Sequence, residues 1–246
     1  MTVIALTQTA GGVGTTTLAA NLTNLWPVPS RILMELGITG GTLLRTMGAE
    51  TSESAIASVP SDLVNDGFDV GLPDARATSL AKCDPENWEL PVLPAPVVPD
   101  FPRPGEPMWW QRRVDLALST TLDVIVDLGR VAPEYLALHN RVLNTATIIL
   151  AVVRNMDEAR RIVARLTLYQ DRLAIVVISK LRSTPQEITE ATGCACAGVL
   201  PFDDEIANHL WRNMLVTESK AKRPSRLYLD GVNQLASYLR GASADG

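Results

Sequence analysis

The residues Ala10-Gly11-Gly12-Val13-Gly14-Thr15-Thr16-Thr17 lie between an apolar run, Val3–Leu6, and a segment with helical periodicity, Leu18–Leu22. Glycines in such a stretch let the backbone curl, so that successive N–H groups and the N-terminus of the following helix point at one anion. A glycine-rich turn by itself is weak evidence, but a strand before it and a helix after it are the context that phosphate binding requires. We therefore predict a phosphate-binding loop, with a tight turn that binds nothing as the alternative.

Apolar runs of strand length recur along the rest of the chain, with segments of helical period between them. The runs are β-branched and nearly unbroken, which is typical of strands buried on both faces of a sheet. Asn155 with Glu158, and Thr184 followed by Pro185, are start signals for two of the helices. This alternation predicts an α/β fold with a mainly parallel, doubly wound sheet, in a single domain over 1–246. The expected strands are Val3–Leu6, Ile32–Met34, Glu89–Leu93, Asp123–Asp127, Thr147–Val153 and Leu173–Ile178.

Composition narrows the class of protein. The 246 residues carry a net charge of −5, with 20% charged and 46% hydrophobic residues, which excludes a disordered chain and argues against a specific nucleic-acid binder. No stretch approaches the roughly 18 apolar residues that span a bilayer. The first six residues lack the basic flank and cleavage site of a signal peptide. Three cysteines, an odd number, do not make a disulfide scaffold. We expect a cytoplasmic protein.

One segment interrupts the alternation of strands and helices. Eight of the sixteen prolines lie between Asp84 and Met108. This composition predicts an extended surface loop over 84–108, apart from the short strand expected at its start. Trp109-Trp110 follows directly. The indole pair is interpreted either as an anchor that holds the loop on the core or as a surface that docks a partner.

The glycine-rich loop resembles the deviant Walker A loop of the ParA/MinD family of P-loop ATPases, Lys-Gly-Gly-x-Gly-Lys-Ser/Thr-Thr. Gly11, Gly12 and Gly14 match the glycines of that pattern. Thr16 falls where the family has its Mg²⁺-binding hydroxyl, and Thr17 matches the last position. The resemblance implies the fold of these ATPases, with ATP or ADP and Mg²⁺ as cofactors.

The sequence also departs from the family pattern. Thr15 stands where the family has the phosphate-loop lysine, and Ala10 where it has the signature lysine that reaches across a dimer. The run Ile32-Leu33-Met34-Glu35-Leu36-Gly37, followed by Gly40-Gly41, resembles the family's second strand. In active members an acidic residue stands at the position of Gly37. Glu35 is interpreted either as a group near the metal or as a charged residue at a strand end.

Two later landmarks follow in the order that the family shows. Residues 123–130, Asp-Val-Ile-Val-Asp-Leu-Gly-Arg, resemble the Walker B/switch II strand, with Asp127 as the ligand of Mg²⁺ through water. Residues 198–203, Gly-Val-Leu-Pro-Phe-Asp, resemble the late loop whose backbone lies near the adenine. The resemblance covers most of the chain and leaves 50–108 unmatched. It is greatest to the CpaE/TadZ-type branch, which is associated with pilus loci and acts in localisation.

The missing groups have physical consequences. A lysine on the β/γ phosphates contributes roughly 1.5–3 kcal/mol, so its loss weakens ATP binding by about one to two decades. Hydrolysis suffers more, because removing one preorganised donor costs on the order of 100- to 1,000-fold. Asp127 and Arg130 are the candidate catalytic residues, and Arg130 and Arg45 are the candidate substitute cations. The predicted nucleotide-binding residues are Gly11, Gly12, Val13, Gly14, Thr15, Thr16, Thr17, Pro201 and Asp203, and the predicted Mg²⁺ residues are Thr16 and Asp127.

Several further features favour structural interpretations. Asp203 and Asp204 are more often the cap of a helix that includes Glu205 than contacts to a base. The cysteines at 83, 194 and 196 fit small core residues better than a metal site, and the histidines at 139 and 209 have no catalytic partner at recognisable spacing. The basic run Lys220–Arg226 is expected to be a solvated loop rather than a DNA or lipid contact. The final helix has an apolar stripe that predicts core packing and not a membrane anchor.

Three functions remain open at this point. The first is a pseudo-ATPase that binds nucleotide weakly, forms a homodimer and marks a cellular position for a pilus or secretion apparatus. The second is an active ATPase that cycles between monomer and dimer with a substitute cation. The third is an interaction scaffold that works without nucleotide.

Overall fold

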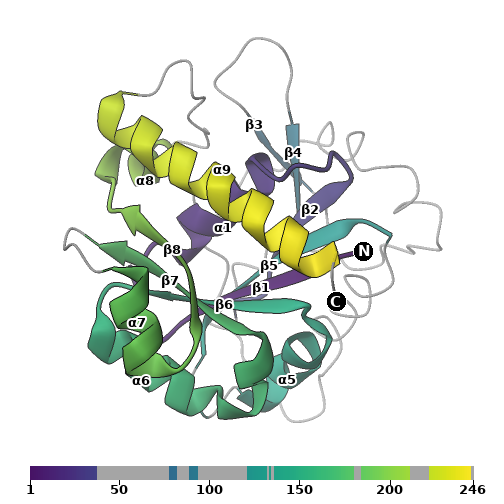
Figure 1. Cartoon of the computed structure of the whole chain (residues 1–246). Helices are drawn as coiled ribbons and strands as arrows, with labels where there is room; N and C mark the ends of the chain where they lie inside the picture. The colour runs from purple at the N-terminus through teal and green to yellow at the C-terminus, as the bar shows by residue number, and fades with distance from the viewer. Residues whose placement is uncertain are drawn as a thin grey trace.

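The computed structural model describes residues 1–37, 78–81, 89–93, 121–131, 133, 136–179, 184–210 and 222–244. Its strands are β1 (Val3–Gln8), β2 (Arg31–Glu35), β3 (Thr78–Ala81), β4 (Glu89–Leu93), β5 (Asp123–Arg130), β6 (Ile148–Val153), β7 (Leu173–Ser179) and β8 (Ala195–Pro201). Within the described residues they form one sheet in the order β3-β4-β2-β5-β1-β6-β7-β8 (Figure 1). Neighbours are parallel, except that β3 and β4 are antiparallel. The mainly parallel sheet that the sequence predicts is confirmed.

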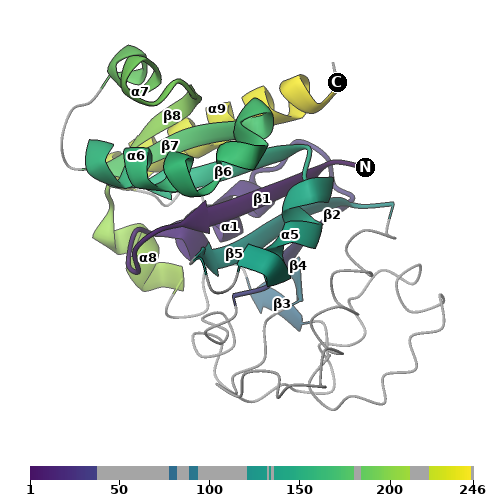
Figure 2. The same cartoon turned by 90° about the horizontal axis from the view of Figure 1, so that it is seen from below.

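Helices cover both faces of this sheet, as a doubly wound fold requires (Figure 2). On one face lie α1, α8 and α9, whose buried side chains share a core cluster with one set of strand residues. On the other face lie α5, α6 and α7. Their bounds are α1 (Thr15–Asn24), α5 (Leu136–Thr145), α6 (Met156–Arg165), α7 (Pro185–Thr192), α8 (Asp204–Leu210) and α9 (Arg223–Ala244), with the 3-10 helix η3 (Thr167–Arg172) before β7.

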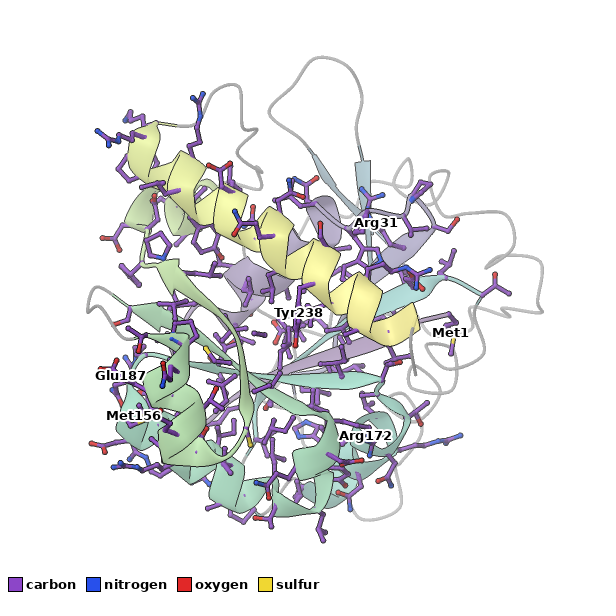
Figure 3. All side chains as sticks on the ribbon, viewed as in Figure 1. Met1, Arg31, Met156, Arg172, Glu187 and Tyr238 are labelled. Carbon is purple, nitrogen blue, oxygen red and sulfur yellow. The ribbon has the colours of Figure 1, made fainter. Side chains whose placement is uncertain are left out.

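The strands supply side chains to both core clusters because successive residues point to opposite faces. In β1, Ile4 and Leu6 pack on the side of α1, while Val3 and Ala5 pack on the side of α5 and α6. All four are at most 1% exposed. Figure 3 shows the side chains filling the space between the sheet and the helices of both layers. The central strands are therefore buried on both faces, which explains their unbroken apolar sequences.

The start signals of two helices and the packing of a third agree with the sequence. Asn155 Oδ1 accepts a hydrogen bond from Glu158 N at 3.0 Å. Thr184 and Glu187 form a capping box, with Pro185 in the first turn of α7. The apolar stripe of α9 packs on the sheet, and the expected residues Tyr228, Val232, Leu235 and Leu239 are all buried there, together with Leu229 and Ala236. No helix in the described part of the chain is long and apolar enough to cross a membrane.

The short strand expected at Glu89–Leu93 is present as β4. Pro91 lacks an N–H, but β4 pairs with β2 only at Val92 and Leu93, so the proline lies before the parallel pairing begins. The rest of the predicted surface loop, 84–88 and 94–108, lies outside the described residues, as does Trp109-Trp110.

The order of the strands places the glycine-rich loop. The chain passes from β1 to β2 on one side and reaches β6 on the other, so β1 lies where the strand order reverses. Ligands of open α/β sheets bind outside the carboxyl ends of the strands at such a switch point. The loop that follows β1 occupies this place, between the ends of β5 and β6.

Candidate functional site

The glycine-rich loop connects the end of β1 to the start of α1. Gly12 and Gly14 have φ angles of 74° and 94°, in the left-handed region that side chains other than glycine rarely adopt. Gly14 is the residue before α1, and among the described residues no side chain caps this helix or places an acid in its first turn. The first backbone bond of α1 is Leu18 N to Gly14 O, so the N–H groups of Thr15, Thr16 and Thr17 have no partner within the helix. The loop therefore has the open amides that an anion site needs.

The residue at the position of the phosphate-loop lysine is held inside the protein. Thr15 is 2% exposed, and its hydroxyl donates to Gln8 Oε1 at 2.7 Å. Gln8 is the last residue of β1. The Thr15 side chain therefore secures the start of α1 to the strand before it, and supplies no positive charge to the loop.

Thr16 and Asp127 come together although they lie 111 residues apart in the chain. The Thr16 hydroxyl donates to Asp127 Oδ2 at 2.6 Å, and Gly129 N donates to Asp127 Oδ1 at 2.9 Å. Asp127 is 2% exposed, and its burial raises the pKa of the carboxyl group, although both hydrogen bonds act in the opposite direction. A hydroxyl and a carboxylate are hard oxygen donors of the kind that Mg²⁺ prefers. Their chemistry fits the metal that the sequence resemblance implies.

Two residues from β2 and the segment after it lie beside Asp127. Glu35 is 2% exposed and is the register partner of Asp127 in the parallel pair of β2 and β5. Leu36 N donates to Asp127 O at 2.8 Å. Gly37 Cα lies 3.5 Å from the position that a Cβ on Gly129 would take. Gly37, at the position where the sequence resemblance implies an acid, is thus next to the residues that follow Asp127 and carries no side chain.

Arg130 and Arg154 flank the loop from the two neighbouring strands. Arg130 ends β5 at the register position of Gln8, and its side chain is exposed. Arg154 follows β6, and its guanidinium contacts the buried Glu158 of α6. The sequence pattern points to Arg130, and neither Arg154 nor Gln8 stands out in it. The sequence does contain a clue to Arg154, because this residue stands directly between a predicted strand and Asn155, the predicted N-cap of the next helix. Arg45 lies outside the described residues.

The late loop ends in a helix cap. Asp203 Oδ1 accepts hydrogen bonds from Glu205 N at 2.7 Å and Ile206 N at 3.1 Å, as the capping interpretation predicts. Its other oxygen, Oδ2, is buried without a partner in the described part of the chain, and so is the hydroxyl of Tyr228. Burial, and to a smaller extent the charge of Asp203, raises the pKa of Tyr228. Pro201 ends β8 and is exposed.

The basic run before the last helix differs in part from the expectation. Arg223 and Arg226 belong to the first turns of α9 and are exposed, whereas a loop was predicted over Lys220–Arg226. Lys222 Nζ lies 3.0 Å from Glu205 Oε1, so this charge is paired with α8. Lys220 lies outside the described residues. The helix starts earlier than expected, with Pro224 in its first turn, where the missing N–H costs nothing.

The remaining titratable candidates have structural surroundings. His139 is fully buried in α5, and desolvation lowers its pKa to about 4, so the ring is neutral. Cys194 is buried and Cys196 partly buried, next to and in the edge strand β8. Among the described residues no group of three or more His, Cys, Asp or Glu could hold a metal ion. Cys83 and the side chain of His209 lie outside the description.

No protein-family model and no curated protein sequence matches the chain. Solved structures match over nearly the whole length. The MinC:MinD cell division protein complex of Aquifex aeolicus contains a chain that is 18% identical, with a TM-score of 0.64 and coverage of 98% of this chain and 96% of that one.

Two further structures agree with this match. The septum site-determining protein MinD of Pyrococcus horikoshii OT3, complexed with Mg-ADP, is 14% identical with a TM-score of 0.64, and 100% of this chain and 99% of that chain are covered. A ParA family ATPase from Chlorobium tepidum TLS is 19% identical with a TM-score of 0.61 and coverage of 93% and 98%. Together with the sheet order and the loop after β1, these similarities identify the fold: the chain has the α/β fold of the MinD and ParA ATPases.

Proposed function

We propose that this protein binds a nucleoside di- or triphosphate with Mg²⁺ at the loop of residues 11–17, hydrolyses it weakly or not at all, and acts as a localisation factor. The observation that carries the proposal is the loop itself. Open amides at the start of α1 lie beside the Thr16–Asp127 pair, while the side chain of Thr15 is turned to Gln8. The groups that bind phosphate through the backbone are retained, and those that supply charge for catalysis are missing.

Each part of the ligand has a group to receive it. Backbone N–H groups of the loop and of the first turn of α1 would hold phosphate oxygens. Thr16 and Asp127 would hold Mg²⁺, Asp127 through a water molecule. The metal would neutralise phosphate charge when it is bound. Pro201 and Asp203 lie at the end of β8, where the family resemblance implies the adenine.

Weak turnover follows from what replaces the catalytic groups. Without the phosphate-loop lysine, affinity falls by about one to two decades. Hydrolysis also lacks the signature lysine at Ala10 and the acid at Gly37, and each preorganised charge is typically worth on the order of 100- to 1,000-fold in rate. A slow or absent reaction with retained binding is the combination that these residues support.

The biological role rests on the likeness to other proteins. The similar structures include a cell division protein and a septum site-determining protein. The loop and the Asp127-Leu128-Gly129-Arg130 segment resemble the CpaE/TadZ-type branch most. We therefore infer a cytoplasmic homodimer that marks a position for a pilus or secretion apparatus. Residues 84–108 and Trp109-Trp110 are the candidate docking segment for its partner.

The test is a calorimetric titration of MgATP and MgADP into nucleotide-stripped protein, with phosphate release followed in parallel. Micromolar to submillimolar binding without turnover supports the proposal. Thr16→Ala and Asp127→Ala variants should bind the magnesium nucleotides more weakly, and normal binding by both would contradict this site. If wild-type protein shows neither binding nor a higher melting temperature with saturating nucleotide, the protein is an interaction scaffold that works without nucleotide.

A second candidate function, an active ATPase, is favoured by one observation. Arg130 ends β5 level with Gln8, directly beside the loop, and its exposed side chain makes no hydrogen bond or ion pair with the other described residues. A guanidinium without a partner in the described part of the chain is available to a phosphate group. A steady-state rate above background that disappears in Arg130→Ala would favour this function over the first.

A further inference from the structure

Arg154 lies directly after β6, the strand that pairs with β1 on the side away from β5. The register pairs Thr7 of β1 with Ala151 of β6. Arg154 is the first residue after β6, and the loop of residues 11–17 follows β1, so both lie at the carboxyl edge of the sheet, beyond two neighbouring strands. The backbone position of Arg154 is therefore beside the loop, at the carboxyl edge of the sheet.

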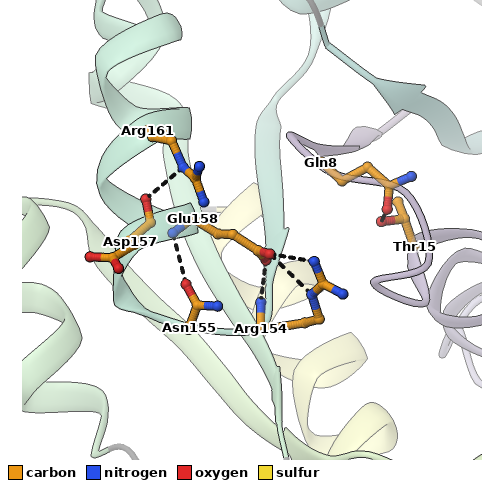
Figure 4. A network of polar contacts seen from close by, with 7 residues as sticks. All are labelled: Gln8, Thr15, Arg154, Asn155, Asp157, Glu158 and Arg161. Carbon is orange, nitrogen blue, oxygen red and sulfur yellow. Dashed lines mark hydrogen bonds and ion pairs between the residues drawn. The ribbon is translucent and has the colours of Figure 1, made fainter.

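β6 ends at Val153, so Arg154 lies just beyond the strand, in the turn that leads into α6. Its guanidinium bonds to Glu158 of α6, a helix on the face of the sheet opposite to α1. Gln8, whose side chain holds Thr15, ends β1 at the same edge of the sheet. Figure 4 shows the guanidinium of Arg154 between Glu158 and the segment with Gln8 and Thr15.

Glu158 fixes the direction of this guanidinium. Its Oε1 accepts hydrogen bonds from Arg154 Nη2 at 2.6 Å and from Nε at 3.0 Å, and its Oε2 accepts one from Arg154 N at 2.8 Å. The Glu158 side chain is 3% exposed, whereas that of Arg154 is 45% exposed. Burial acts to raise the pKa of Glu158, but the bonds from Arg154 outweigh it and lower the pKa, so the carboxylate stays charged.

One edge of the guanidinium remains available. Within the described residues Nη1 of Arg154 has no hydrogen-bond partner, while Nε and Nη2 are both used by Glu158. The three other arginines near this edge differ from it. Arg161 Nε donates to Asp157 O on the exposed side of α6, Arg165 Nη1 donates to Val131 O, and Arg130 is held by no described side chain. Of these four arginines, Arg154 is the one whose guanidinium is held by a buried carboxylate and keeps one edge unused by the described residues.

We propose that Arg154, held in place by Glu158, contacts a phosphate oxygen of an oligophosphate bound at the loop of residues 11–17. It would replace, within one subunit, positive charge that Ala10 and Thr15 do not supply. Glu158 is a positioning residue, because it acts only through Arg154. The proposal rests on the proposed function, since it requires that the loop binds phosphate.

The physical basis is preorganisation. A guanidinium has five N–H donors in a rigid fork, so it can give one edge to a buried carboxylate and another to a phosphate. Glu158 offsets part of its charge, but also removes the entropy cost of aligning a long side chain. A single charge-assisted hydrogen bond of this kind corresponds to about tenfold in affinity.

The experiment compares Arg154→Gln with wild-type protein by calorimetric titration of MgATP and of magnesium tripolyphosphate, which has no base or sugar. We expect about tenfold weaker binding of both ligands. Arg161→Gln, which removes an exposed arginine of α6, the helix that carries Glu158, is the matched control and should bind as wild type does. Equal affinities of wild type and Arg154→Gln would overturn the proposal.

Folding is controlled separately, because Arg154→Gln leaves Glu158 buried without its cation. The double variant Arg154→Gln/Glu158→Gln removes both charges, so it replaces the single variant if that one does not fold. Its affinity should also be about tenfold weaker than that of wild type, and an equal affinity would overturn the proposal. Glu158→Gln alone keeps the cation and loosens its alignment, so its affinity should lie between those of wild type and Arg154→Gln. An affinity of Glu158→Gln equal to wild type would overturn its positioning role. A wild-type protein that binds neither ligand would overturn the proposed function itself, an outcome distinct from failure of Arg154→Gln to differ.

Discussion

The strand β5 carries a buried aspartate at each end, and the two differ in their surroundings. Asp123, at the amino end, accepts hydrogen bonds from Thr2 N at 2.7 Å and Trp26 Nε1 at 2.9 Å, and lies 3.5 Å from Arg240 Nε. Asp127, at the carboxyl end, has the Thr16 hydroxyl and Gly129 N as its partners in the described part of the chain, with no cation.

The surroundings of the two aspartates indicate different roles for the two ends of the sheet. At the amino end one carboxylate joins the first residues of the chain, the end of α1 and the last turns of α9, so its charge is compensated and its role is structural. At the carboxyl end no cation among the described residues pairs with the buried Asp127, and the pKa of its carboxyl group is raised by burial. An uncompensated buried carboxylate beside an open anion site is expected where a metal ion completes the site.

Replacing the structural carboxylate should have the largest effect. Asp123→Ala leaves the indole N–H of Trp26 and the backbone N–H of Thr2 buried without partners, which should lower the free energy of unfolding by about 3–5 kcal/mol. Thermal unfolding followed by circular dichroism should show a melting temperature lower by roughly 10 °C. Asp171→Ala, whose side chain is 74% exposed beside Arg172, is the control and should change little. A loss below about 1 kcal/mol in Asp123→Ala would remove the distinction between the two ends.

Restoring the missing cation at the carboxyl end should change binding more than folding, since the lost Thr15–Gln8 hydrogen bond costs only about 1 kcal/mol in the free energy of unfolding. Thr15→Lys places an ammonium at the start of α1, and we expect about 10- to 100-fold tighter binding of MgATP by calorimetry. Gln186→Lys adds the same charge on the distant helix α7 and should leave the affinity unchanged. If both variants bind equally, net charge and not the loop position explains the result.

The shape of the loop can be tested with adjacent glycines. A Cβ on Gly12 meets no atom within 4 Å, so Gly12→Ala is opposed only by its φ of 74° and should cost about 1 kcal/mol in denaturant unfolding. Gly12→Ala should also weaken the binding of MgATP, because the backbone amides of the loop turn away from the anion. Gly11 has equal space and no such φ, so Gly11→Ala should be nearly neutral. An equal effect of the two substitutions would contradict the importance of the left-handed position.

The smallest effect on stability is expected for Asp127→Asn. The folded-state pKa of Asp127 lies above its ordinary value of 3.8, so the stability of wild type is full below that pH and decreases as the pH rises through the folded-state pKa. An amide can still accept from Gly129 N and bond to Thr16. Asp127→Asn should therefore have a slightly higher melting temperature at pH 7, and the advantage should vanish as the pH falls below 4. A lower melting temperature at pH 7 would show that the charge is compensated after all.

Much of this site could be predicted from the sequence because it depends on local pattern. The loop, the strand before it and the helix after it are contiguous, so spacing alone identifies them. The cap at Asp203 and the starts of α6 and α7 likewise need only three or four residues. The sequence also shows that residues 123–130 resemble the metal-binding strand of a known family.

The sequence by itself therefore determined the elements: parallel strands that are apolar on both faces, the anion loop after the first of them, and the absence of lysine at Ala10 and Thr15. Only the tertiary structure decided which distant residues meet. The strand order brings Asp127 to Thr16 and places Arg154 beside the loop, and the burial of Thr15 directs its hydroxyl to Gln8. The physical reason is that hydrophobic periodicity specifies which face of a strand is buried, whereas the neighbours of a strand are chosen by the packing of the whole sheet.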